Sequence, residues 1–263
     1  MKTKVITLIF TLFLITSRIA SGQDAPAPIN AAKSFIGVAG GIAMPTGNFA
    51  ASDFTNTETQ HFPSDAHDNS LGFAQNGVHL ALEGAYYITP YFGIGGVFNT
   101  SSFSVNVSQI ALAYIKAFDC DSGTCTARNY NSVSLLVGPY FAFPVQKLTI
   151  EARILGGVTN TTSPDIIVEA INRPDPTDPI SISKFVQTSG TAATFGFQAG
   201  LGIKYAVMEH WSIGIRGDYF YSKPNIAVDN VGRQDNTGRE IFSYNQPIAG
   251  FAGTVGIAYL FGK

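Results

Sequence analysis

The stretch TAATFGFQAGLGIKYAV, residues 191–207, decides the fold because its side chains alternate in character. One set of alternate positions is mainly apolar: Phe195, Phe197, Ala199, Leu201, Ile203, Tyr205 and Val207. The other set is small or polar: Thr194, Gly196, Gln198, Gly200, Gly202 and Lys204. Successive residues of a β-strand point to opposite sides. This period of two therefore predicts a long strand with one apolar face and one face of small or polar residues.

The same alternation recurs along the chain. We expect eight strands, at residues 33–45, 72–88, 92–101, 130–144, 147–159, 191–207, 211–222 and 247–261. The connections after the second, fourth and sixth strands have two or three residues, whereas the other connections exceed twenty. This rhythm is typical of membrane barrels with short periplasmic turns and long outer loops. The predicted fold is all-β, an eight-stranded antiparallel up-and-down transmembrane β-barrel with both termini in the periplasm.

A soluble β-barrel or sandwich is the alternative fold, in which the apolar face would point inward. Its water-facing surface should be rich in charge. The predicted strand 191–207 offers only Lys204, and the strand 247–261 has no charged residue. A narrow lumen instead requires small residues, because an eight-stranded barrel is just wide enough for side chains to fill it. The charge distribution therefore favours a bacterial outer-membrane location.

Aromatic residues gather near both ends of the predicted strands. The periplasmic group is Tyr86, Phe92, Phe143, Trp211, Tyr259 and Phe261, and the outer group is Phe98, Phe195, Tyr219, Tyr221 and Phe251. Two such girdles are typical of membrane barrels. Inside the strand 130–144, Pro139 removes one ladder donor, so we expect a bulge or a weak edge beside Gly138.

The N-terminal residues are typical of an export signal. Lys2 and Lys4 precede an uncharged run that Arg18 closes, and small residues before Gln23 suit a signal peptidase. We expect a signal peptide at 1–22, a short periplasmic tether at 23–32 and the barrel with four long outer loops at 33–263. An uncleaved anchor helix is the alternative, but the run is shorter than the ~20 apolar residues of a spanning helix. Loss of three bases leaves 13 basic and 18 acidic residues, a formal charge of −5, and no nucleic-acid partner is expected.

Residues 40–49 (GGIAMPTGNF) and the last predicted strand, 247–261, resemble the outer-membrane β-barrel domain family of Bacteroidota and, more distantly, OmpA-type and OmpX-type membrane domains. Residues 40–49 (GGIAMPTGNF) are similar to the family's Gly-rich first strand and following turn. The last strand is similar to the signal read by barrel-assembly machinery, carried here by Thr254, Gly256, Tyr259 and Phe261. It departs from the commonest ending because Gly262 and Lys263 follow the aromatic residue. The resemblance implies a fold, a location and relatives such as PorT-like secretion accessories, but no activity.

The predicted lumen contains the only clustered chemistry. Counted from the short turns, six charged residues should form one layer: Glu83, Glu151, Arg153, Lys204, Arg216 and Asp218. Unpaired charges in a closed lumen are costly, whereas a paired set is tolerable and blocks the bore. A structural plug is the favoured interpretation, and a gated conduit for protons or small ions is the alternative. His79 could join the upper edge of this layer or bond to Ser and Thr neighbours.

The long connections carry weaker signals. In an exported protein, the only two cysteines, Cys120 and Cys125, predict a disulfide, with two separate thiols as the alternative. Nearby acids partly resemble a calcium loop, but position twelve is Tyr130 where Glu is needed. In the first loop, a metal could be held by His61, Asp65, His67 and Asp68, although solvated side chains are the simpler interpretation. Residues 173–179 (RPDPTDP) should be stiff and extended, as a surface contact element. We expect no metal and no cofactor.

Three function classes remain open. The favoured one is a non-enzymatic protein with a structural or surface-interaction role, because binding is usually placed on long loops. Its partners would be outer-membrane lipids, barrel-assembly machinery and an extracellular ligand or partner protein. The second class is a narrow pore or a secretion accessory barrel. The third is a lipid-modifying enzyme, which needs a His beside an outward-facing nucleophile near the outer rim, and no such Ser and His pair is evident.

Overall fold

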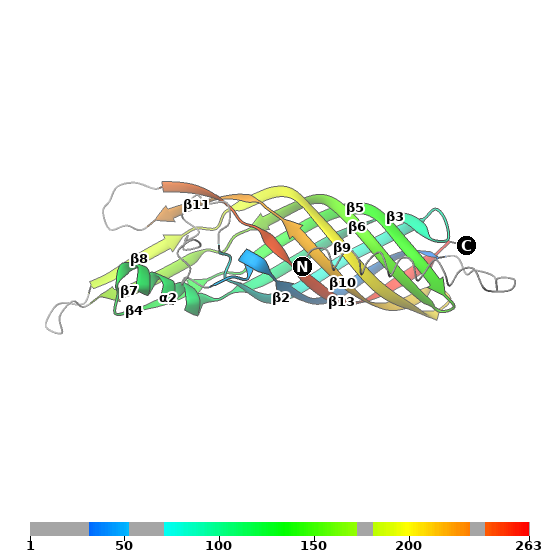
Figure 1. Ribbon diagram of the computed structural model, residues 1–263, viewed down its shortest axis with the longest axis horizontal. Coiled ribbons are helices and arrows are strands. Elements are labelled where there is room, and N and C mark those ends of the chain that lie inside the picture. Colours follow the sequence, from blue (N-terminus) through cyan, green and yellow to red (C-terminus); the bar gives the residue numbers. More distant parts are fainter. Residues whose placement is uncertain (1–31, 53–70, 173–180, 232–239, 263) are drawn as a thin grey trace, which may run out of the picture. The chain divides into compact units, whose positions relative to one another are not determined.

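Eight long antiparallel strands close into a barrel in the computed structural model, which describes residues 32–52, 71–172, 181–231 and 240–262. The barrel strands are β1 (Ser34–Pro45), β2 (Ala74–Tyr87), β3 (Phe92–Val105), β5 (Tyr130–Val145), β6 (Leu148–Thr162), β9 (Thr191–Met208), β10 (Trp211–Ser222) and β13 (Ile248–Phe261). Each pairs with the barrel strands before and after it in the chain, and β1 pairs with β13. Figure 1 shows the resulting tilted wall. The predicted eight-stranded antiparallel up-and-down barrel is confirmed, while its position in a membrane is taken up below.

Inward-facing glycines make room for large side chains from neighbouring strands. On β9, Gly200 pairs with Asp218 and Gly202 with Arg216. A Cβ atom on Gly202 would lie 3.0 Å from Nε of Arg216, and one on Gly200 would collide with the Asp218 carboxylate. The absence of side chains at these positions lets charged groups cross a lumen that eight strands leave narrow.

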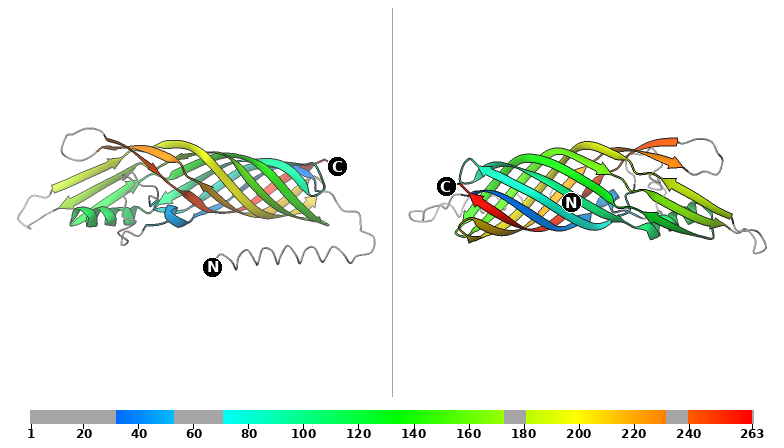
Figure 2. Two further views of the ribbon diagram at one scale, coloured as in Figure 1. Left: turned by 45° about the horizontal axis from the view of Figure 1, so that its top comes forward. Right: turned by 180° about the vertical axis from the view of Figure 1, so that it is seen from behind.

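Both ends of the barrel chain lie beside the short turns. The backbone N–H of Ala32 donates to the carbonyl of Pro90 in the β2–β3 turn, at 3.3 Å. The N–H of Leu260 donates to the carbonyl of His210 in the β9–β10 turn, at 2.8 Å. Figure 2 shows the C-terminal end at this turn end. The predicted signal peptide and all but the last residue of the predicted tether lie outside the described residues, and that last residue, Ala32, is buried.

The proline inside β5 interrupts one ladder without a bulge. Pro139 pairs with Ile94 of β3. Toward β6, the pairing runs to Val137 and resumes at Tyr140 in an unchanged register. The expected weak point is therefore present as a short gap in the β5–β6 ladder, and the bulge alternative was wrong. The gap coincides with Pro139 because its backbone nitrogen has no hydrogen to donate to the ladder.

The long connections, which were expected to be loops, contain strands and a helix. A second sheet has the order β12 (Glu240–Asn245), β11 (Asn225–Val231), β8 (Ser181–Gln187), β7 (Ile166–Asn172) and β4 (Ser122–Ala127). Helix α2 (Val107–Phe118) packs on β4, and a 3₁₀ turn, η1 (Gly47–Phe49), follows β1. Figures 1 and 2 show these elements at the end opposite the short turns. Among the described residues, no helix combines the length and apolar character needed to cross a membrane.

Candidate functional site in the barrel lumen

Every charged residue of the eight barrel strands points into the lumen. There are six: Glu83 on β2, Glu151 and Arg153 on β6, Lys204 on β9, and Arg216 and Asp218 on β10. All six are members of one linked set of ion pairs. These are the six residues that the strand periodicity placed in one layer, and we call them the charge layer.

Arg153 is the centre of the charge layer. Its Nε and Nη2 atoms donate to the two carboxylate oxygens of Asp218, at 2.9 and 2.8 Å. Its Nη1 atom donates to Oε2 of Glu83 at 2.6 Å and to the hydroxyl of Tyr140 at 3.0 Å. A two-pronged arginine–carboxylate pair is both strong and directional. Arg153 therefore links three strands across the lumen.

A second branch joins the remaining charges. Arg216 donates through Nη1 to Glu83 and through Nη2 to Oε2 of Glu151, the latter at 2.6 Å. The Nζ atom of Lys204 lies 3.0 Å from the same Glu151 oxygen. The hydroxyl of Tyr87 donates to the other oxygen of Glu151 at 3.0 Å. Each acid therefore has at least one basic partner, and two acids have two.

The charge layer is neutral and dry enough to act as a barrier. Three acids face three bases, so the formal charges cancel. Arg153 and Glu151 are each only 3% exposed, and Asp218 is 1% exposed. A cavity of about 20 Å³ lies next to this layer, beside Lys204 and Ser212. That is room for about one water molecule.

Hydroxyl and amide groups fill the lumen on the outer side of the charge layer. Asn99 donates through Nδ2 to Oε1 of Gln198 at 3.1 Å. Nδ1 of His79 lies 2.8 Å from the hydroxyl of Ser101. Two further pairs are Ser134 with Thr159 at 2.9 Å and Ser132 with Thr161 at 3.4 Å. His79 thus bonds to a serine neighbour, which was one of the two arrangements expected for it.

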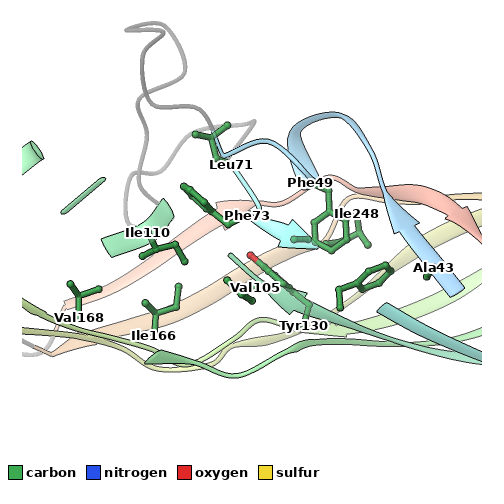
Figure 3. Packing of buried hydrophobic residues seen from close by; sticks show 12 residues of the cluster. Ala43, Phe49, Leu71, Phe73, Val105, Ile110, Tyr130, Ile166, Val168 and Ile248 are labelled. Carbon is green, nitrogen blue, oxygen red and sulfur yellow. The ribbon is translucent and has the colours of Figure 1, made fainter. Parts of the chain in front are cut away.

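An apolar cluster closes the outer mouth of the barrel, and sequence reasoning missed it. Figure 3 shows side chains from η1, β3, β5, α2 and β7 converging there. Phe49 of η1 is fully buried, with ring centroids 5.0 Å from Phe103 and 5.2 Å from Tyr130 in edge-to-face contacts. Phe103 also contacts Phe220. We use the name outer cap for the part of this cluster that lies over the lumen, formed by Phe49, Phe103, Tyr130, Phe220 and Ile248. The turn motif after β1 is visible in the sequence, but nothing in it indicates that Phe49 folds back over the lumen.

The outward face of the barrel has no charged residue and is mainly apolar, with polar residues such as Asn131 and Asn160 only near the strand ends away from the short turns. Its exposed side chains include Leu201, Ile213, Ile215, Leu80 and Val255, each more than half exposed. The residues of both predicted aromatic girdles also lie on this face, and Trp211 and Tyr259 meet edge to face at 5.4 Å. In the predicted assembly signal, Tyr259 and Phe261 face outward, whereas Thr254 faces the lumen opposite Arg216.

The structure does not show the predicted disulfide between Cys120 and Cys125. Both residues are half-buried, and Cys125 points from β4 into the apolar cluster beneath α2. Burial raises the pKa of the Cys125 thiol to about 11, and it raises the pKa of Tyr244 on β12 to about 12. No cluster of His, Cys, Asp or Glu suited to a metal is found among the described residues. The first-loop residues His61, Asp65, His67 and Asp68, and the segment 173–179, lie outside them.

Comparisons with known proteins give a limited result. No protein-family model and no curated protein matches the sequence. A major outer membrane protein from Thermus thermophilus is 13% identical, with a TM-score of 0.45 over 87% of this chain and 99% of that one. Ail, the attachment invasion locus protein of Yersinia pestis, is 12% identical, with a TM-score of 0.41 over 88% and 99%. The outer membrane protease OmpT of Escherichia coli is 7% identical, with a TM-score of 0.41 over 91% and 99%. Likenesses at this level transfer no property, so the barrel assignment rests on the strand pairing itself.

Proposed function

We propose that this protein is a bacterial outer-membrane β-barrel without catalytic activity, closed along its lumen, that presents its outer elements to an extracellular ligand or partner protein. One observation carries the membrane part of the proposal. All six charged residues of the barrel strands point inward, so the outward face has no charge. A protein surface in water is rich in charged groups, whereas a surface in lipid excludes them.

The size of the apolar face fits a bilayer. On β9, the outward positions run from Phe195 to Val207 without a charged residue. At about 3.3 Å per residue and a tilt of about 40°, this stretch spans roughly 30 Å along the barrel axis. The hydrocarbon core of a bilayer is about 30 Å thick. Short turns and both chain ends would then face the periplasm, as in other bacterial barrels.

Two barriers in series support a closed lumen. The charge layer fills the bore with paired side chains, and the outer cap covers its mouth with buried aromatic rings. A pore for protons, ions or small solutes would need both barriers to rearrange. Opening the charge layer alone would still leave Phe49 and Phe103 across the exit, so we place the pore second.

The surface role is supported by where the chain places its additional structure. Three of the four long connections build the second sheet and α2, although loops of a few residues would suffice to join the barrel strands. Ordered elements on the outer side are where binding would be located. The finer family, whether Bacteroidota barrels or PorT-like secretion accessories, stays a prediction, as do the roles of barrel-assembly machinery and lipids as partners.

The non-enzymatic part of the proposal is supported by the position of the histidine and serine that do meet. His79 and Ser101 bond to each other, but both are buried in the lumen between the charge layer and the outer cap. A lipid-modifying enzyme needs such a pair on the lipid-facing rim. No substrate reaches this pair while both barriers are closed.

Cell fractionation tests the proposal. Protein expressed with its N-terminal segment should co-sediment with outer membranes, resist extraction by carbonate, and migrate faster on gels unboiled than boiled because a closed barrel resists SDS. Protease added to intact cells should cut only in the outer connections. Release by carbonate or high salt, or migration that heating does not change, would contradict the membrane assignment.

A further inference from the structure

A small polar chamber lies between the charge layer and the outer cap. It is a cavity of about 20 Å³ lined by His79, Asn99, Ser101, Gln198 and hydroxyl groups of β5 and β6. Its outer side is formed by three cap residues, Phe103, Phe220 and Ile248. On the side toward the turns, Gln198 is one inward position from Gly200, which pairs with Asp218 of the charge layer. The chamber thus lies between the charge layer on one side and the outer cap on the other.

Two buried nitrogen atoms in this chamber lack a protein partner. They are Nε2 of His79 and Nε2 of Gln198, neither of which has a hydrogen-bond partner within the described part of the chain. His79 is 3% exposed and Gln198 is 1% exposed. A buried polar group that makes no hydrogen bond destabilises the folded protein. The neighbouring Ser134–Thr159 pair, in contrast, satisfies itself.

The fold brings these two side chains to the lining of the same cavity. His79 bonds to Ser101 and Gln198 bonds to Asn99. Ser101 and Asn99 are successive inward positions of β3, so the two anchored side chains occupy neighbouring levels of one lumen. A cavity of about 20 Å³ exceeds the ~10–15 Å³ that one water needs, and a buried water requires two to four polar partners. The chamber meets both conditions.

We propose that an ordered water molecule bridges Nε2 of Gln198 and Nε2 of His79. The Gln198 amide can only donate from its nitrogen, so the water accepts there. In the arrangement that we propose, the water donates to His79, so that Nε2 is an acceptor and the ring proton is on Nδ1, which donates to Ser101. The site therefore binds water and fixes a single neutral tautomer of His79. This inference requires only the closed barrel and is independent of the proposed surface role.

Nuclear magnetic resonance can test the site directly. Protein with ¹⁵N-labelled histidine rings, refolded in detergent micelles at pH 8, should give the two-bond ¹H–¹⁵N pattern of an Nδ1-protonated ring for His79. A His79→Phe variant assigns the signal among the four histidines of the chain. Cross-relaxation between water and the Gln198 side-chain amide should show a long-lived contact. An Nε2-protonated ring, or an amide without a water contact, would overturn the proposal.

A variant pair separates the water site from general lumen packing. Gln198→Leu removes the donor to the water, so the water contact should disappear and His79 should change to a mixture of tautomers. Thr161→Ala removes a hydroxyl that bonds to Ser132 in the same layer, and it should leave the His79 pattern unchanged. Equal effects of both variants on His79 would contradict a specific bridge. The wild-type tautomer tests the proposal by itself if a variant does not fold.

Discussion

The two faces of the barrel wall differ in the side chains that they bury and expose: charged residues are buried on the inner face, and apolar residues are exposed on the outer face. Along β6, Arg153 is 3% exposed and makes four hydrogen bonds within the lumen, while the next residue, Ile154, is 60% exposed and points outward. In a water-soluble protein these environments would be exchanged, with isoleucine inside and arginine outside. The inversion repeats on β10 with Arg216 and Ile215.

This contrast shows that the surroundings of each face, and not the strand itself, decide whether a polar or an apolar side chain is favoured there. Toward β9, Arg153 and Ile154 are successive members of one unbroken ladder, whereas toward β5 only Arg153 is paired, because Ile154 lies opposite Pro139. What differs is that the inward side chain must find partners in the protein, whereas the outward one needs none. Substitutions on the two faces should therefore have different costs, and they can be compared at neighbouring positions.

The largest expected effect is the loss of the central arginine. Arg153→Ala removes the only basic partner of Asp218 among the described residues, and Asp218 is 1% exposed. Breaking a buried pair costs about 3–5 kcal/mol, and access of water to the lumen would lower this value. Ile154→Ala removes only contacts that lipid partly replaces. Urea titrations of protein folded into lipid vesicles should show Arg153→Ala to be clearly the less stable of the two.

The control for that comparison is Arg216→Ala. The two acidic partners of Arg216 each keep another basic partner in this variant, because Glu83 still pairs with Arg153 and Glu151 still pairs with Lys204. We therefore expect a smaller loss of stability than for Arg153→Ala. If Ile154→Ala were as destabilising as Arg153→Ala, the charge layer would contribute nothing specific and the plug hypothesis would be wrong.

A charge placed on the outward face should lower the stability of the barrel slightly less than Arg153→Ala does. Leu201 lies in the middle of the apolar band of β9 and is 68% exposed. In a bilayer, Leu201→Lys should destabilise the barrel by about 2–4 kcal/mol. The matched control is Ile241→Lys on β12, because Ile241 is equally exposed and, under the proposed function, faces water. This substitution should change the free energy of unfolding by no more than about 0.5 kcal/mol. Equal, small effects at both positions would indicate a soluble barrel.

A smaller effect is expected at the predicted assembly signal. Tyr259 stacks on His210 at 5.7 Å and meets Trp211 edge to face. Tyr259→Leu should cost about 0.5–1.5 kcal/mol for a lost aromatic contact. If assembly machinery reads the last strand, the yield of folded protein in outer membranes should fall more than this loss explains. Tyr86→Leu, in the same girdle but on β2, should lower the yield less.

The smallest effect concerns the cysteines, because it changes a rate and not the stability of the fold. Burial raises the pKa of Cys125 to about 11, so its thiol is protonated at pH 8 and should react slowly with maleimide. Its labelling should accelerate as the pH rises toward that value. A disulfide with Cys120 in the exported protein would instead abolish labelling at every pH until a reductant is added, and mass spectrometry distinguishes the two results.

The barrel wall could be predicted from sequence because it depends on a local rule. A period of two assigns each residue of β9 or β10 to a face, and counting from the short turns gives its level. Glu83 and Arg216 could be placed in one layer in this way, although they are far apart in the chain. Which acid of the charge layer pairs with which base, for example Asp218 with Arg153, depends on the geometry of the lumen. The spacing of residues in the sequence does not encode it.

Several features of the outer elements could not be predicted because no clear alternation of apolar and polar residues marks them. Strand β4 reads SGTCTA, a run of small and polar residues that resembles a loop and becomes a strand only by pairing with β7. Phe49 follows a turn motif, but its burial depends on Phe103 and Tyr130 from distant strands. The two cysteines are close in sequence, yet Cys125 joins an apolar cluster instead of facing a partner thiol.

Conductance across planar lipid bilayers tests the central claim most directly, because it asks whether the lumen is closed. Refolded wild-type protein should insert and remain near-silent, since the charge layer and the outer cap both cross the bore. Insertion must be verified separately, by the heat-dependent gel mobility of protein recovered from the same vesicles. Steady channel conductance from inserted wild-type protein would contradict the plug and make the narrow pore the better account.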